Sequence, residues 1–124
     1  STGDFSETDE ELQGVEMDRN LTQTKEFPYN WKHIKGAKPF VMEVCCTSLV
    51  MINKDSGAPD AGCAQVFVDG QEVLFVDPKV NGWTHCNPLI CFQNRERRTW
   101  HVEVRMQQGD EDKEFTILGF GIVR

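Results

Sequence analysis

The sequence lacks any long hydrophobic run. No stretch approaches the roughly 18 consecutive apolar residues of a membrane-spanning helix. Residues 1–11 (STGDFSETDEE) have neither the basic start nor the apolar stretch of a signal peptide, so we expect any signal to lie upstream of them. We also expect no membrane partner. The 124 residues, 39% of them hydrophobic, suit one globular domain with a core of ordinary size.

Clustered basic residues are equally scarce. The net charge is −7, and residues 1–20 hold −6 of it, with seven acids against one base. The remaining 104 residues carry 12 bases and 13 acids, which sum to −1, and the RERR segment at 95–98 is their single basic cluster. Nucleic-acid-binding proteins present clustered Lys and Arg. We therefore expect no nucleic-acid partner.

Sequence motifs of catalysis are missing as well. There is no GxSxG elbow, no glycine-rich phosphate loop and no HExxH metal motif. Ser48 or Ser56 could be combined with a histidine and an acid into a hydrolytic triad, but every protein of this size contains those residue types. We predict that the chain is not an enzyme and has no catalytic residues.

The cysteines do not form a disulfide or zinc pattern. Their number is odd (five), Cys45 and Cys46 are adjacent, and no CxxC pair occurs. We expect reduced thiols that act as small buried hydrophobes. Residues 109–115 (GDEDKEF) lack the alternating acids of a calcium loop and are more typical of a charged hairpin tip. We therefore predict no metal and no other cofactor.

Strand patterns fill most of the chain after a polar start. Residues 1–24 are acidic and aperiodic, which indicates a linker or mobile arm. Residues 64–69 and 71–77 form a predicted hairpin around Asp69-Gly70, and 99–106 alternates so that Trp100 faces the core. Further strand-like segments occupy 39–53, 87–92 and 114–123, where two glycines, at 119 and 121, suggest a bend. Seven strands at this spacing predict an all-β fold, an antiparallel β-sandwich of jelly-roll type, over residues 25–124.

Two tryptophans fall outside the regular strand patterns. Trp83 lies in VNGWTHCNP (80–88), where turn residues on both sides favour a loop, and Trp31 lies in FPYNWKHI (27–34). A saccharide site needs an exposed flat ring beside short polar side chains that donate and accept hydrogen bonds. Two alternatives stay open: the indoles plug the ends of the sandwich, and the polar residues bond their own loop backbone. The candidate carbohydrate-binding residues are Trp83, Trp31, Tyr29, Asn81, His85 and Asn87.

Three separated motifs resemble a known family. They are AGCAQVFVDGQEVLFVD (61–77), NGWTHCNP (81–88) and HVEVRMQQGDEDKEFTILGFGIV (101–123). Together they are similar to the accessory β-sandwich domains of SGNH/GDSL-type carbohydrate esterases from gut and rumen Firmicutes, over roughly residues 38–124. Asn81 departs from that pattern, which has a second glycine there, and no GDS-type serine segment is present.

The resemblance implies a non-catalytic, secreted module attached to the catalytic domain of a parent enzyme. It implies a plant cell-wall polysaccharide as ligand, either a β-glucan or a hemicellulose. It points to Trp83, with Gly82, Asn87 and Pro88 around it, and less directly to Trp31. The alternative function is a structural accessory domain that mediates domain or subunit packing without sugar binding.

Overall fold

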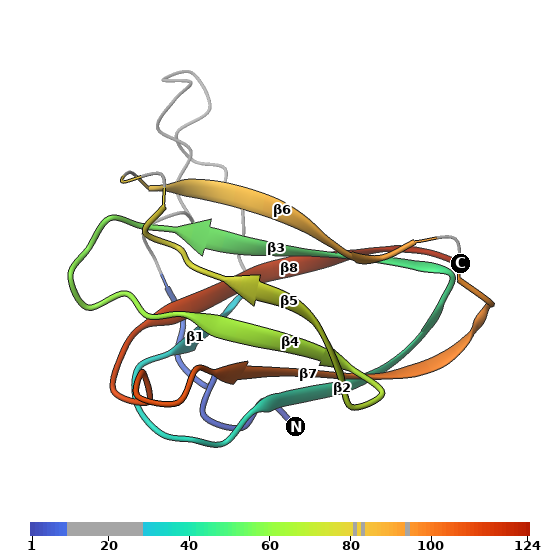
Figure 1. Cartoon of the computed structure of the whole chain (residues 1–124), viewed down its shortest axis with the longest axis horizontal. Helices are drawn as coiled ribbons and strands as arrows, with labels where there is room; N and C mark the ends of the chain where they lie inside the picture. Colours follow the sequence, from blue (N-terminus) through green and yellow to red (C-terminus); the bar gives the residue numbers. More distant parts are fainter. Residues whose placement is uncertain (10–28, 81, 83, 94) are drawn as a thin grey trace.

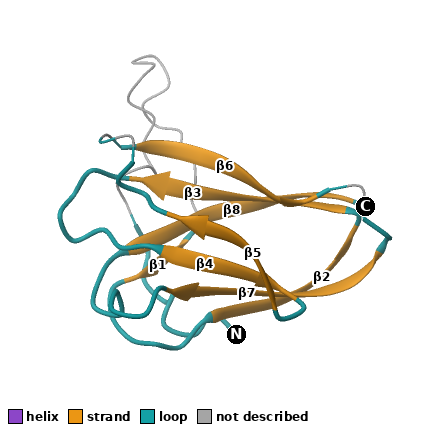
Figure 2. Cartoon of the chain, viewed as in Figure 1, coloured by secondary structure: helices purple, strands orange, loops and turns teal. Residues whose placement is uncertain are grey.

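The molecule is a sandwich of two antiparallel four-stranded sheets (Figures 1 and 2). The structure is a computed structural model that describes residues 1–9, 29–80, 82, 84–93 and 95–124. None of these residues is helical, so this part of the chain contains no helix that could cross a membrane. The predicted all-β sandwich is confirmed. Its strands are β1 (Trp31–His33), β2 (Phe40–Cys46), β3 (Ser48–Asp55), β4 (Ala64–Val68), β5 (Gln71–Val76), β6 (His85–Phe92), β7 (Arg98–Met106) and β8 (Phe115–Val123).

The first sheet, called sheet A, has the strand order β1-β8-β3-β6, and the second, sheet B, has the order β2-β7-β4-β5. In sheet B the alternation of the sequence is followed directly: Trp100 and every second residue after it on β7 are buried. The β4–β5 hairpin turns at Asp69 and Gly70, both with positive φ, as predicted. The inner face of sheet B is therefore apolar along its length. Its buried members are Phe40, Cys46, Ala64, Val66, Val68, Val76, Trp100, Val102, Val104 and Met106.

Sheet A departs from strict alternation at a β-bulge in β8. Ile52 pairs with Gly119 and the next residue, Asn53, pairs with Ile117, so Leu118 is an extra residue on β8. The bulge reverses the alternation of the strand, and Phe120 consequently turns inward, with its ring 5.7 Å from that of Phe40 in sheet B. The bend expected at Gly119 corresponds to this bulge.

Strands β2 and β3 are consecutive but belong to opposite sheets. The sequence pattern over 39–53 indicates one continuous β-rich block, and the structure divides it at Thr47. The backbone N–H and the hydroxyl of Thr47 both donate to the carbonyl oxygen of Val123, at 2.7 and 3.0 Å. These bonds hold the crossover against the end of β8.

Residues 1–9 pack on the sandwich, which differs from the mobile arm expected for residues 1–24. Phe5 is fully buried, with its ring 5.1 Å from that of His33 and 6.4 Å from that of Phe40. Backbone bonds also join Glu7 to Lys32 in both directions. Burying one phenylalanine contributes roughly 1.5–3 kcal/mol. The hydrogen bonds of Ser1 to Val41, of Asp4 to Lys38 and of Glu7 to Lys32 add to this contribution. Residues 10–24 of the predicted arm lie outside the described residues.

Candidate functional site

Tyr29 is displayed at the β1 edge of sheet A. Its side chain is 84% exposed. The neighbouring Asn30 is buried, and its amide pairs with the backbone of Asp9: the Oδ1 atom accepts the Asp9 N–H and the Nδ2 group donates to the Asp9 carbonyl, both at 2.9 Å. This two-bond clamp fixes the backbone beside Tyr29. An exposed aromatic ring on a fixed backbone is able to bind a flat apolar ligand face at low entropic cost.

Trp31, two residues further along, is packed rather than displayed. The indole is half-buried, and its ring lies 5.3 Å from that of Phe40 and 6.0 Å from that of Phe120. Because β1 is an edge strand, this packing closes the side of the sandwich between the two sheets. It corresponds to the plugging alternative that the sequence left open.

His85 and Asn87 lie on the opposite edge of sheet A, within β6. The turn-type residues Asn87 and Pro88 favour a loop, but β6 begins at His85 and continues through both. A proline is tolerated there because β6 is an edge strand, which does not need every N–H for the ladder. The loop expected around Trp83 is therefore wrong at positions 85 and 86, whereas the strand predicted over 87–92 is confirmed.

The side chains of His85 and Asn87 converge on Asp55, a buried carboxylate on the adjacent strand β3. The His85 Nε2 atom is 3.3 Å from Asp55 Oδ2, and the Asn87 Nδ2 group donates to the same oxygen at 3.3 Å. The Nδ2 group of Asn53 donates to Asp55 Oδ1 at 3.1 Å. In these contacts the side chains of His85 and Asn87 reach the neighbouring strand β3. The contacts with Asp55 hold the side chains of His85 and Asn87 in place.

The polar cluster of Asn53, Asp55, His85 and Asn87 is continuous with the core. Asp55 and Asn53 are 1% and 0% exposed, and the Oδ1 atom of Asn53 has no hydrogen-bond partner among the described residues. The sequence did contain a signal for this cluster. The alternation that buries Leu49 and Met51 continues to positions 53 and 55, which places both polar side chains inside.

The structure does not bring the two edges of sheet A together. One row of paired residues runs across it from Trp31 through Ile117 and Asn53 to Asn87. Three strand spacings separate its ends, or roughly 14 Å, and Figure 1 shows β1 and β6 at opposite edges. The candidate residues Tyr29 and Trp31 therefore form a location distinct from His85 and Asn87. The candidates Trp83 and Asn81 lie outside the described residues.

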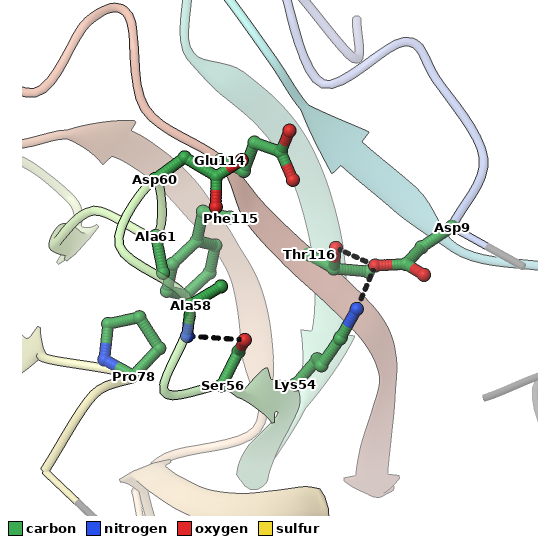
Figure 3. Close-up of a pocket in the computed structure, with 10 residues that line it drawn as sticks. All are labelled: Asp9, Lys54, Ser56, Ala58, Asp60, Ala61, Pro78, Glu114, Phe115 and Thr116. Carbon is green, nitrogen blue, oxygen red and sulfur yellow. Dashed lines mark hydrogen bonds and ion pairs between the residues drawn. The ribbon is translucent and has the colours of Figure 1, made fainter. Parts of the chain in front are cut away.

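A small polar cavity lies where residues 1–9 meet the ends of β3 and β8 (Figure 3). The Asp9 Oδ2 atom accepts hydrogen bonds from Lys54 Nζ and from the Thr116 hydroxyl, each at 2.8 Å. The volume of about 30 Å³ suits a single water molecule, not a sugar ring. The cavity is therefore part of the packing of the N-terminal segment.

Ser56, one of the two serines considered for a triad, lies on the wall of this cavity. Its Oγ atom accepts the backbone N–H of Ala58 at 3.2 Å. The lining side chains contain no histidine: they are Asp9, Lys54, Ser56, Ala58, Asp60, Ala61, Pro78, Glu114, Phe115 and Thr116. A serine nucleophile needs an adjacent base, and the lining supplies no imidazole for that purpose.

The five thiols are free, and burial differs widely among them. Cys45 is exposed, while Cys46 and Cys91 are buried. Burial raises the pKa of the Cys91 thiol to about 11 and also raises the pKa values of Cys46 and Cys63. Thiols with raised pKa values are poor nucleophiles and poor metal ligands. Within the described segments, no group of three or more His, Cys, Asp or Glu side chains is arranged to hold a metal ion.

Comparison with known proteins relates the fold to carbohydrate esterases. No family model matches the chain, and no curated protein sequence matches it significantly. A two-domain esterase active on acetylated mannans superposes on 91% of this chain, with a TM-score of 0.68 and 16% identity. A two-domain esterase of the same type, co-crystallised with mannopentaose, superposes on 76% of this chain, with a TM-score of 0.64 and 17% identity. An acetyl xylan esterase from the rumen bacterium Butyrivibrio proteoclasticus gives a TM-score of 0.44 over 70% of this chain and 23% of its own, at 14% identity.

This chain spans only 32% and 28% of the two mannan esterase chains. At these identities the similarity establishes a shared fold. The two mannan esterases are two-domain enzymes, and a small β-sandwich of this size is compatible with an accessory domain of such an enzyme.

Proposed function

We propose that the chain is the accessory β-sandwich domain of a larger carbohydrate esterase and that it binds the polysaccharide on which the esterase acts. The observation that carries the proposal is the superposition of 91% of this chain on about a third of a two-domain esterase. The sequence resemblance to accessory domains of SGNH-type esterases of Firmicutes supports the same assignment from separate motifs. A module of this kind increases the effective concentration of its enzyme at the polymer.

The proposed ligand is a neutral hemicellulose or β-glucan. Mannan is favoured among these because the esterase neighbours act on acetylated mannans. Since such polymers are extracellular, we propose a secreted parent enzyme. Exposed Tyr29 supports ring stacking, and Trp83 is proposed as the second aromatic contact from its motif, with Asn81 beside it. His85 and Asn87, held by Asp55, would shape the β6 edge next to that motif.

Affinity gel electrophoresis with glucomannan, xylan and mixed-linkage β-glucan tests this function. We expect the 124-residue chain to be retarded by at least one of them, with Kd values from micromolar to millimolar. Retardation should fall roughly tenfold or more in Trp83→Ala and less in Tyr29→Ala, because one stacked ring contributes roughly 1–3 kcal/mol. Val123→Ala removes an exposed apolar side chain at the C-terminal end of β8 and serves as the control.

No retardation by any polymer would overturn the proposed binding. The alternative, a domain that packs against its catalytic partner without sugar, would then be favoured. Concentration-dependent association with the separately expressed catalytic domain would be its direct measurement.

A further inference from the structure

The outer face of sheet B carries a transverse row of three side chains of different chemistry. Phe75 on β5 pairs with Gln65 on β4, which in turn pairs with Arg105 on β7. Directly paired residues point to the same face of a sheet, so the ring, the amide and the guanidinium lie side by side over about two strand spacings, roughly 10 Å. We call these three residues the sheet B strip.

The side chain of Phe75 does not belong to the hydrophobic core. Its ring is 52% exposed, whereas Val76, the next residue on β5, is 3% exposed and belongs to the core. An exposed flat ring beside polar side chains has the chemistry that stacking on a sugar ring requires.

The polar members of the strip are held in place by neighbouring side chains. The guanidinium of Arg105 lies 4.1 Å above the ring of Phe67 and also forms an ion pair with Glu103. The Nε2 group of Gln65 donates to Glu72 Oε2 at 3.3 Å. Fixed donors and acceptors lose little rotamer freedom when a ligand binds.

A hollow continues the strip beyond Arg105. It has a volume of about 290 Å³ and opens at the surface beside Gln65 and Arg105. Gln108 and Glu111 add an amide and a carboxylate to its wall, and Met106 and Ala37 complete the lining. Its size is near the lower end of ligand pockets, and its polar groups both donate and accept hydrogen bonds.

We infer that the sheet B strip and its adjoining hollow form a binding site for a neutral polysaccharide chain, with Phe75 as the stacking platform and Gln65, Arg105 and Gln108 as hydrogen-bonding partners. The site lies on the outer face of sheet B, whereas His85 and Asn87 lie on β6 of sheet A. This inference rests on the proposed function and gives it a second location.

The charge around the strip selects the class of sugar polymer. Glu72, Glu103 and Glu111 contribute −3 and Arg105 contributes +1, which leaves −2 around the site. A polyuronate or another polyanion would be repelled. Hydroxyl groups of neutral sugars, by contrast, hydrogen-bond to carboxylates, amides and guanidinium groups alike.

Titration of the 124-residue chain with mannopentaose and with glucomannan, followed by two-dimensional ¹H–¹⁵N NMR, locates the site. The expected shifts are on β4, β5 and β7 around the strip and at the Gln65 and Gln108 side-chain amides. Phe75→Ala should weaken binding roughly tenfold, and Phe75→Leu should do the same because leucine keeps apolar bulk but not the flat ring. Ile90→Ala, which removes a side chain of matching exposure (54%) from β6, should leave binding unchanged.

Other results would overturn the sheet B strip, the proposed function or the neutral ligand class. Binding by the unmodified chain that is lost in Trp83→Ala but unchanged in Phe75→Ala would overturn the strip and leave the proposed function in place. Shifts confined to residues 29–31 and 84–87 would have the same meaning. An absence of binding to every polymer would overturn both, and tight binding of polygalacturonate would refute the neutral ligand class.

Discussion

The two sheets share one core but divide its polar chemistry unequally. The inner face of sheet B is apolar along its length, while the inner face of sheet A ends in a buried carboxylate, Asp55, with polar partners on β3 and β6. Their outer faces differ as well, since sheet B presents the exposed aromatic ring of Phe75 and sheet A the exposed aliphatic side chain of Ile90. The comparison teaches that the core side of sheet B is built from apolar side chains, whereas that of sheet A also contains a hydrogen-bonded polar cluster.

The largest expected effect tests the apolar side of this comparison. Trp100→Ala in sheet B should reduce the free energy of unfolding by about 3–5 kcal/mol, because it empties a buried indole site and leaves the Cys46 carbonyl without its 2.9 Å donor. Urea unfolding followed by circular dichroism measures the loss. Trp31→Ala, at the half-buried edge of sheet A, is the matched variant and should cost less than half as much. Equal losses would show that the edge of sheet A is packed as tightly as the centre of sheet B.

Sheet B was largely predictable from the sequence, and particular residues show why. The alternation around Trp100 and the turn at Asp69-Gly70 are local signals, and both are confirmed. The division of β2 and β3 between sheets was not predictable because it depends on pairing with β7 and β8, far away in sequence. The register in which two strands pair also decides which polar side chains contact each other.

The candidate site was less predictable than the fold. Phe5 is buried, but it lies in an acidic segment whose composition predicts a mobile arm. One phenylalanine changes the composition of such a segment too little to alter that prediction. The turn propensity of Asn87 and Pro88 concealed the start of β6, since edge strands tolerate residues that central strands do not. Alternation along β3 places Asn53 and Asp55 inside, but their contacts with His85 and Asn87 depend on the pairing of β6 with β3, which the sequence does not reveal.

The next largest effect concerns the polar end of sheet A. Asp55→Ala should destabilise the fold by about 2–4 kcal/mol, because the Nδ2 groups of Asn53 and Asn87 lose a buried acceptor. Asp55→Asn keeps one acceptor oxygen and should cost less. Glu43→Ala removes an exposed carboxylate from sheet B and should stay within about 0.5 kcal/mol. If Asp55→Ala resembles Glu43→Ala in thermal unfolding, the cluster does not stabilise this end.

The next prediction concerns how stability depends on pH, and it compares the buried thiol of Cys91 in sheet A with the exposed thiol of Cys45 in sheet B. The pKa of Cys91 is raised to about 11 in the folded state, against an ordinary value of about 9. Between these values the unfolded chain releases the proton and the folded chain keeps it, so the contribution of this thiol to stability is complete below about pH 9 and falls as the pH rises toward 11. The loss attributable to this thiol is roughly 2–3 kcal/mol.

Cys91→Ala should flatten that part of the stability profile, measured by urea unfolding at several pH values between 7 and 11. Cys45→Ala, at an exposed position on β2, should change the profile less than Cys91→Ala does. A profile identical in all three proteins would contradict the assignment of the buried thiol. Alkylation of the folded chain at pH 8 should likewise modify Cys45 well before Cys91.

The smallest expected effect compares one glycine from each sheet. Gly70, in the β4–β5 turn of sheet B, has a φ of 84°, and Gly119, at the bulge of sheet A, does not have a positive φ. An added Cβ would meet no atom within 4 Å at either position, so the comparison isolates backbone conformation from packing. Gly70→Ala should therefore cost about 1 kcal/mol. Gly119→Ala should be neutral or slightly stabilising, because alanine restricts the unfolded chain.

Amide hydrogen exchange would show which strands lose stability in Gly70→Ala. Faster exchange should be confined to β4 and β5, since Asp69 still accepts the His101 N–H and keeps the turn attached to β7. This hairpin carries Phe75 and Gln65, so its loosening should also weaken glycan binding at the strip more than the stability change alone would. A Gly119→Ala variant with the larger loss would mean that the bulge, and not the hairpin, is the strained element of the sandwich.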